Sequence, residues 1–419
     1  MNRVEKRKLA KLSKKKNSEL QLSQQDLAKL ASNMILNEEF REAERIYNKL
    51  MALDDTNTSV LHFAGITKYK LGEYDDALNL LNKSITISPD YAEAHNSKGI
   101  ILFQQRKYDE SLKCFNEAVL LKPNYANAYL NLGNAYYELK DLDQAIKSYE
   151  TSFTLNNNIE AAYKLAGIHL TIDDASSALE YANYTLQINP HCQHALAYKA
   201  IANWGLGNSS GWKDLYNYEE MIYQLDITTP HGYSSLKEFN NSLANDIFNH
   251  KSLVWEPLER VTNGGAVTSD LLLKPTRSIK SLKNSISKAV DELKKSLIKD
   301  KENPLCRIIP DNYKMTLVGS ILKEHGVHPP HIHENSRLSG VYYVHIPDFI
   351  SRDDSSHYVW LEFGRPNLKI NSDVGLEITT RYPEEGTLLI FPSYFFHGTI
   401  PFESRGDRIG IAFDLYPIC

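Results

Sequence analysis

The chain lacks the features that mark membrane, secreted and nucleic-acid-binding proteins. Its 419 residues contain no apolar run of 18 residues, so we expect no membrane-spanning helix. Its four cysteines are scattered and form no C-x-x-C pair, which predicts reduced thiols and a cytoplasmic location. A formal net charge of −5 argues against a general nucleic-acid binder. We therefore expect neither a membrane nor a nucleic acid among its partners.

Positive charge is concentrated at the N-terminus. Residues 1–16 read MNRVEKRKLAKLSKKK, with eight lysines or arginines against one glutamate. This stretch lacks the apolar segment of a signal peptide. We expect residues 1–20 to form a disordered, solvated basic tail, with binding to an acidic or RNA partner as the alternative.

The N-terminal half is periodic. Glycines recur every 34 residues, at Gly65, Gly99, Gly133 and Gly167. Small residues keep the same step at Ala43, Ala77, Ser111 and Ala145. Each unit contains two amphipathic stretches at helical spacing. We expect the small residues to lie where the two helices of a unit approach each other closely.

This pattern resembles the tetratricopeptide repeat. Four regular units run from about residue 24 to 158, and a fifth ends at Pro190. A sixth departs from the pattern in its second helix, as a terminal capping repeat does. The resemblance implies an all-α solenoid over residues 21–222 whose concave groove binds a protein or peptide partner. Self-association, or a rigid spacer packed on the rest of the chain, is the alternative.

Residues 223–419 follow a different pattern. Amphipathic stretches predict one helix from Leu236 to Asn249 and another from about Ser278 to Lys299. From Lys314 onward, short apolar runs alternate with Gly, Pro and Asp turns, which is typical of β-strands. We therefore expect a β domain with flanking helices.

Three histidines and an arginine in this region could form a metal site. Residues two apart in an extended strand point to the same face, about 6.6 Å apart along the chain, so His331 and His333 can reach one metal. His397 follows an apolar strand, and could complete a facial triad typical of non-heme Fe(II) oxygenases. Arg408 begins the apolar strand RIGIAFDLY. A buried unpaired arginine is costly, so an anionic ligand is expected beside it.

Several ordered motifs here resemble the 2-oxoglutarate- and Fe(II)-dependent oxygenases. They are H-x-H at His331 and His333, S-G-V-Y-Y-V at Ser339 to Val344, F-P-S at Phe391 to Ser393, the later His397, and the R-I-x-I-x-F strand at Arg408 to Phe413. Residues 255–272 resemble the family's opening strand and loop. The resemblance implies a double-stranded β-helix (jelly roll) over residues 223–419. It also implies Fe(II) on the three histidines, 2-oxoglutarate paired with Arg408, and hydroxylation of a C–H bond.

The motif departs from the usual two-His, one-carboxylate triad because His333 stands at the carboxylate position. Glu334 is adjacent but would need a bulge to reach the metal. Two alternatives to the keto-acid enzyme therefore remain open. One is a three-His dioxygenase that uses no keto acid, and the other is a non-catalytic tetratricopeptide scaffold whose barrel binds a ligand.

Three further positions bear on the pocket. Tyr343 shares parity with the two nearby histidines if the strand is unbroken, so we expect it, rather than Tyr342, to line the pocket and bond an oxyanion. Gly410 stands where many relatives have the serine of Arg-x-Ser, so no hydroxyl is available there. His328, next to two prolines, is expected to be a loop residue outside the metal site.

Overall fold

The structure is a computed structural model that describes residues 23–257, 262–297, 303–353, 356–368, 370, 375–403 and 406–418. The predicted basic tail lies outside these residues. The chain divides into two compact units, Met1–Asn158 and Ile159–Cys419. This division falls inside the repeat array, and the predicted domain boundary at residues 222/223 stays a prediction. Among the described residues, no helix is both long and apolar enough to cross a bilayer.

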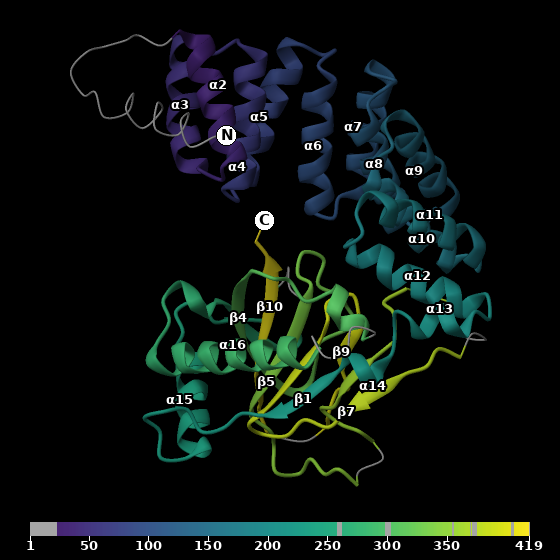
Figure 1. The fold of residues 1–419 in the computed structure, drawn as a ribbon. Coiled ribbons are helices and arrows are strands. Elements are labelled where there is room, and N and C mark those ends of the chain that lie inside the picture. The colour runs from purple at the N-terminus through teal and green to yellow at the C-terminus, as the bar shows by residue number, and fades with distance from the viewer. Residues whose placement is uncertain are drawn as a thin grey trace. The chain divides into compact units, whose positions relative to one another are not determined.

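The first unit consists of helices arranged as consecutive antiparallel pairs (Figure 1). They are α2 (Gln24–Leu36), α3 (Phe40–Leu53), α4 (Thr58–Lys70), α5 (Tyr74–Ile87), α6 (Ala92–Gln104), α7 (Tyr108–Leu121), α8 (Ala126–Glu138) and α9 (Leu142–Asn156). Each pair corresponds to one predicted repeat, so the period in the sequence is the period of the helical stack.

The repeated small residues lie at the helix contacts, as predicted. A Cβ atom on Gly99 would stand 2.5 Å from the Phe115 ring of the paired helix. A Cβ on Gly133 would stand 2.4 Å from the Tyr149 ring. Ala43 and its repeat equivalents are completely buried. The 34-residue step therefore records where two helices of a repeat touch, since no larger side chain fits there.

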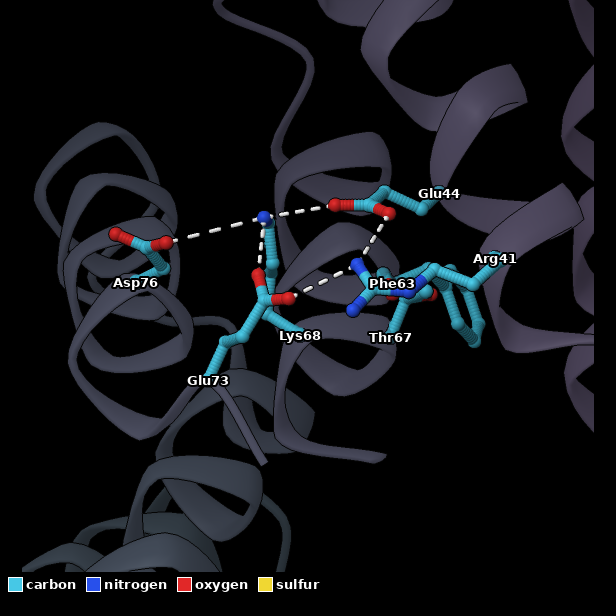
Figure 2. A network of polar contacts seen from close by, with 7 residues as sticks. All are labelled: Arg41, Glu44, Phe63, Thr67, Lys68, Glu73 and Asp76. Atoms are coloured by element: carbon cyan, nitrogen blue, oxygen red, sulfur yellow. Dashed lines mark hydrogen bonds and ion pairs between the residues drawn. The ribbon is translucent and has the colours of Figure 1, made fainter. Parts of the chain in front are cut away.

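An ion-pair network joins the first two repeats (Figure 2). The Lys68 ammonium lies 2.8 Å from Glu44, 2.5 Å from Glu73 and 3.8 Å from Asp76. Arg41 bridges the first two carboxylates at 3.1 and 3.0 Å. The Lys68 side chain is only 19% exposed. Its hydrogen bonds lower the pKa of Glu44 and of Glu73.

We predict that Lys68→Met destabilises α3–α5 by about 1 kcal/mol, near the upper end of the range for exposed ion pairs. The lowered carboxyl pKa values mean that this stability is present above the unfolded pKa of about 4.3 and is lost as pH falls below it. Hydrogen–deuterium exchange of the full chain at pH 7 and at low pH measures both effects. Lys83→Met, which removes an exposed pair with Asp55, is the control. Equal exchange in the two variants would contradict the prediction.

The second unit begins with the remaining repeat helices. Its helices are α10 (Ile159–Thr171), α11 (Ala175–Ile188), α12 (Gln193–Gly205), α13 (Ser209–Lys213), α14 (Tyr218–Met221), α15 (Leu236–Phe248) and α16 (Arg277–Leu297), with 3₁₀ turns η1 (Leu271–Leu273) and η2 (Pro304–Arg307). The second helix of the sixth repeat is reduced to the five residues of α13, as its irregular sequence predicts. Helices α15 and α16 agree with the two predicted helices.

Two antiparallel sheets follow in the second unit. The strands are β1 (Tyr223–Asp226), β2 (Val254–Trp255), β3 (Asn263–Asp270), β4 (Tyr313–Val327), β5 (Leu338–His345), β6 (Leu361–Phe363), β7 (Thr379–Arg381), β8 (Thr387–Pro392), β9 (His397–Thr399) and β10 (Arg408–Pro417). The large sheet has the order β1-β8-β5-β10-β4-β3-β2, and the small sheet has the order β7-β6-β9. The predicted class, an α solenoid followed by a sheet-rich domain with flanking helices, is confirmed. Its description as a jelly roll stays a prediction.

The last repeats share one hydrophobic core with the sheets of the second unit. Tyr216 stacks on Phe395 with ring centroids 4.5 Å apart and donates a hydrogen bond of 2.9 Å to the Tyr394 carbonyl. The Tyr394 hydroxyl in turn donates to the Leu215 carbonyl at 2.7 Å. Trp212 of α13 stacks on Tyr216 at 4.6 Å. These contacts fix the segment directly before β9.

The two faces of the large sheet have different neighbours. Its outer face packs on α15, where Tyr342 donates a hydrogen bond of 2.6 Å to Asn240, and α16 lies beside the same sheet (Figure 1). Side chains in a strand alternate between faces, so Ser339, Val341 and Tyr343 point the other way. A cavity lies on that inner face.

Candidate metal centre

A two-way backbone bridge holds the H-x-H segment against β9. The His331 N–H donates to the His397 carbonyl at 3.0 Å, and the His397 N–H donates to the His331 carbonyl at 3.0 Å. The His333 N–H donates to Ser393 at 3.0 Å. The segment is extended but lies outside the named strands, because Pro329 and Pro330 have no N–H to donate. In place of the expected regular strand, this segment forms a single β-bridge.

This bridge brings the three predicted histidines together. One ring nitrogen from each of His331, His333 and His397 lies within 4.8 Å of the others, which makes them a candidate metal group among the described residues. Their ring centroids are 4.4 to 5.1 Å apart. His397 is 6% exposed, and the other two are half-buried.

Each imidazole has its Nδ1 atom occupied by an acceptor. His331 Nδ1 lies 2.8 Å from the Pro329 carbonyl, and His397 Nδ1 lies 2.9 Å from the Phe395 carbonyl. His333 Nδ1 lies 2.8 Å from Asp414 Oδ1. A carbonyl or carboxylate oxygen can only accept, so Nδ1 carries the proton in each ring. The three Nε2 lone pairs are left to face one another.

Burial favours the neutral form of two of these rings. Burial, and then the neighbouring His333, lowers the pKa of His331 to about 4. The pKa of His397 is also lowered, first by burial and then by His331 and His333. Converging lone pairs on neutral imidazoles repel one another unless a cation lies between them. The donor set therefore fits a divalent metal such as Fe(II), with open positions for further ligands.

Asp414, a further residue beside this site, lies just outside the motifs of the sequence. Its side chain is 14% exposed, and Ser336 and Ser339 donate hydrogen bonds of 3.0 and 2.6 Å to its Oδ1 atom. Burial raises its pKa, but His333 and the two hydroxyls outweigh this and lower the pKa overall. The sequence did contain a signal, because Asp414 is a charged residue with the parity of Arg408 on the same apolar strand.

Arg408 is buried without an anionic partner. It is 2% exposed, and no carboxylate of the described residues lies within ion-pair distance. Its guanidinium carbon lies 5.2 Å from the Tyr343 ring centroid. Arg408 Nε and the Tyr343 hydroxyl are both buried and make no hydrogen bond within the described chain. Burial lowers the pKa of Arg408, yet an arginine side chain remains a cation in proteins.

A cavity of about 430 Å³ connects Arg408 with the three histidines. The residues that line the cavity also include Ser320, His328, Glu334, Asn335, Val341 and Gly398. Tyr343 is not among the lining residues, because it lies beneath Arg408. Tyr343 does lie on the inner face of β5, as its parity predicts, and its proposed contact with an oxyanion stays a prediction.

Two other expectations change. His328 is not a remote loop residue, because it lines the cavity, where burial and then Arg408 lower its pKa. Its two neighbouring prolines lie against Gly398 of β9, which turns the segment inward. Glu334 is outside the histidine group, and its exposed carboxylate lies 3.5 Å from His194 Nε2 in α12.

Gly410 has no hydroxyl of its own, but a serine hydroxyl lies close to it on the neighbouring strand. Gly410 pairs with Ser320 across β10 and β4. A Cβ atom on Gly410 would lie 3.8 Å from Ser320 Oγ and 3.3 Å from Val341 Cγ2. Ser320 is buried and lines the cavity, so it supplies a hydroxyl to the part of the cavity wall beside Gly410.

Family models match both parts of the chain. The family described as "Putative 2OG-Fe(II) oxygenase" matches residues 319–414. Tetratricopeptide repeat families match residues 65–105, 99–140 and 126–158. The chain joins tetratricopeptide repeats to a 2OG-Fe(II) oxygenase-family domain. Both resemblances noted in the sequence are thereby confirmed, and the three histidines, Arg408 and Asp414 all fall within the oxygenase match.

Solved structures with tetratricopeptide folds are similar to part of the chain. PilF of Pseudomonas aeruginosa is 19% identical, with a TM-score of 0.43, and the match covers 46% of this chain and 92% of that one. A crystal structure of MamA is 25% identical, with a TM-score of 0.34 and coverage of 38% and 92%. These TM-scores carry no functional conclusion. A comparison with curated protein sequences finds no match.

We predict that the purified protein binds one ferrous ion and that His397→Ala abolishes this binding. Loss of one imidazole leaves two ligands and opens the metal to exchange. The measurement is metal analysis after anaerobic reconstitution with Fe(II), with His331→Ala and His333→Ala as parallel variants. His325→Ala, which removes an exposed histidine, should bind like the wild type. Unchanged iron in all three ligand variants would exclude the site, and retention in His333→Ala alone would point to Glu334.

Proposed function

We propose that the oxygenase-family domain is a non-heme dioxygenase that uses Fe(II) and 2-oxoglutarate to hydroxylate a C–H bond. His331, His333 and His397 would hold the metal. When bound, iron would supply the reaction of dioxygen in which one oxygen atom enters succinate as 2-oxoglutarate loses carbon dioxide and the other is inserted into the substrate C–H bond.

The observation that carries this proposal is the unpaired Arg408. A fully buried guanidinium without a carboxylate partner costs free energy unless a ligand supplies the anion. Arg408 lies in the cavity that also contains the histidine group. A ligand with two carboxylates could place one at the metal and the other against Arg408. The planar guanidinium suits such bidentate pairing.

Other residues of the chain prepare this position. The Tyr343 ring supports the Arg408 side chain at 5.2 Å and limits its movement. His328 lines the same cavity as Arg408 and the three histidines. Ser320 offers the nearest hydroxyl beside Gly410. These groups bind and orient the co-substrate and exclude water from it.

The three-His ligand set supports one alternative, a dioxygenase that binds its substrate directly and uses no keto acid. The unpaired Arg408 favours the keto-acid enzyme, because a dioxygenase without a dicarboxylate would leave that cation unneutralised. Production of succinate and carbon dioxide separates the two. A scaffold that only binds a ligand would show neither these products nor oxygen uptake.

We further propose that the tetratricopeptide repeats dock a protein or peptide, which is the substrate or a partner. Such repeats indicate protein–protein interaction. In the second unit, the α12 residue His194 lies 3.5 Å from Glu334. Glu334 and Asn335 are exposed and line the cavity, so they mark its mouth. A segment bound along α12 would therefore pass the entrance to the proposed site.

We predict that Arg408→Ala weakens 2-oxoglutarate binding by roughly two to three orders of magnitude. Breaking a buried ion pair costs about 3–5 kcal/mol, and each 1.4 kcal/mol is about tenfold in affinity. The measurement is titration of 2-oxoglutarate into the anaerobic Fe(II) protein while the metal-to-ligand absorption band is followed.

Arg381→Ala is the matched control for this titration. Arg381 is half-buried on β7 and hydrogen-bonds to Thr379 and Tyr218, away from the cavity lining. It should leave the affinity unchanged. If Arg408→Ala binds as tightly as the wild type, or if the wild type shows no band, the keto-acid mechanism is wrong and the three-His alternative takes its place.

We predict that a photo-crosslinking residue at Asn335 captures the docked segment, whereas one at Glu180, exposed on α11, does not. The captured species should gain one oxygen atom when it is incubated with iron-loaded wild type, 2-oxoglutarate and oxygen, as mass spectrometry would detect. Equal capture at both positions, or a captured species that never gains oxygen, would contradict docking of a substrate at this mouth.

A further inference from the structure

The three candidate metal ligands differ in the group that accepts a hydrogen bond from their Nδ1 atom. His331 and His397 each donate from Nδ1 to a neutral backbone carbonyl two residues earlier. His333 alone donates to a carboxylate, that of Asp414, whose two oxygens lie 2.8 and 2.9 Å away. The partner is 81 residues distant in sequence, so tertiary structure and not local geometry creates this contact.

The carboxylate is held in place by its own partners. Ser336 and Ser339 donate to Oδ1, and both hydroxyls lie 2.8 Å from Ser393 Oγ. Ser393 also accepts the backbone N–H of His333. Burying a carboxylate costs free energy unless the carboxylate is hydrogen-bonded. An apolar side chain would fill this position at lower cost, so the charge itself needs an explanation.

We propose that Asp414 is a positioning residue that supplies, through His333, the negative charge which the ligand set itself lacks. This inference rests on the metal site of the proposed function. In a triad of two histidines and one carboxylate, a divalent metal and its ligands carry a net charge of about +1. Three neutral histidines leave about +2, and the Asp414 carboxylate behind His333 restores about +1. The negative charge therefore lies on a residue that is hydrogen-bonded to one ligand, and not on a ligand itself.

Two consequences follow from the geometry. Asp414 fixes His333 in the Nδ1–H tautomer, which directs Nε2 to the metal, and it makes that nitrogen more basic. Carboxylates placed behind ligating histidines typically contribute 10–100-fold to metal affinity. A more basic ligand also stabilises Fe(III) relative to Fe(II), so the midpoint potential of the iron should respond to the charge.

The test compares Asp414→Asn with the wild type. The amide oxygen can still accept from His333 Nδ1, but the charge is lost. We expect Fe(II) affinity, measured anaerobically by competition with a chelator, to fall by roughly 10–100-fold. We also expect the Fe(III)/Fe(II) midpoint potential to rise. A purely structural role would not move the potential in a set direction.

Glu385→Gln is the matched control, because it removes the carboxylate that lies 2.7 Å from Nδ1 of His345, an exposed histidine outside the metal group. It should retain affinity within a few-fold of the wild type and an unchanged potential. If Asp414→Asn does not fold, by near-ultraviolet circular dichroism of the iron-free protein, Asp414→Ser provides the same comparison. Wild-type affinity or wild-type potential in the charge-free variant would overturn the inference.

The same titrations separate this inference from the proposed function. A wild type that binds Fe(II) tightly but gives no 2-oxoglutarate band would refute the keto-acid mechanism and leave the Asp414 comparison valid. A wild type with the band, together with unchanged affinity in Asp414→Asn, would refute only the role of Asp414. A wild type that binds no Fe(II) would refute both.

Discussion

The pair of backbone hydrogen bonds between His331 and His397 is the contact on which the site depends. It joins a proline-bounded segment to the short strand β9 and sets the distance between rings that are 66 positions apart. The position of His333 follows, because its N–H reaches Ser393 in the turn before β9. Hydrogen bonds between His328 and Thr399 extend the same contact.

The rest of the second unit supports that bridge from two directions. Trp212 and Tyr216, at the end of the repeat array, form an aromatic stack with Phe395. This stack fixes the turn that leads into His397. The large sheet provides the other wall, with Asp414 and Arg408 on one face of β10. The last repeats pack against the sheets in one hydrophobic core, which explains why the second unit starts inside the array.

The cavity combines charges that only a ligand set can balance. Neutral imidazole lone pairs face one another at one place, and an unpaired guanidinium lies at another. Under the proposed function, a metal cation would satisfy the first, and a dicarboxylate would satisfy the second while reaching the metal. Asp414, hydrogen-bonded to His333 Nδ1, would add the negative charge that the three histidines lack. Each group is costly alone, so the arrangement is best understood as a binding site rather than as a means of stabilising the fold.

The sequence by itself determined the repeat period, the small residues at helix contacts and the two helices before the β domain, and it indicated His331, His333, His397 and Arg408 as candidates for the site. These features are local or periodic, so spacing alone reveals them. Tertiary structure decided that His328 faces the cavity, that Tyr343 lies under Arg408, that Glu334 turns to His194, and that Asp414 meets His333. Those contacts depend on strand register, including the shift between β10 and β5 at Ile409/Gly410, and on how the two sheets face each other. A one-residue change of register reverses every side chain, so no pattern within one strand could have fixed them.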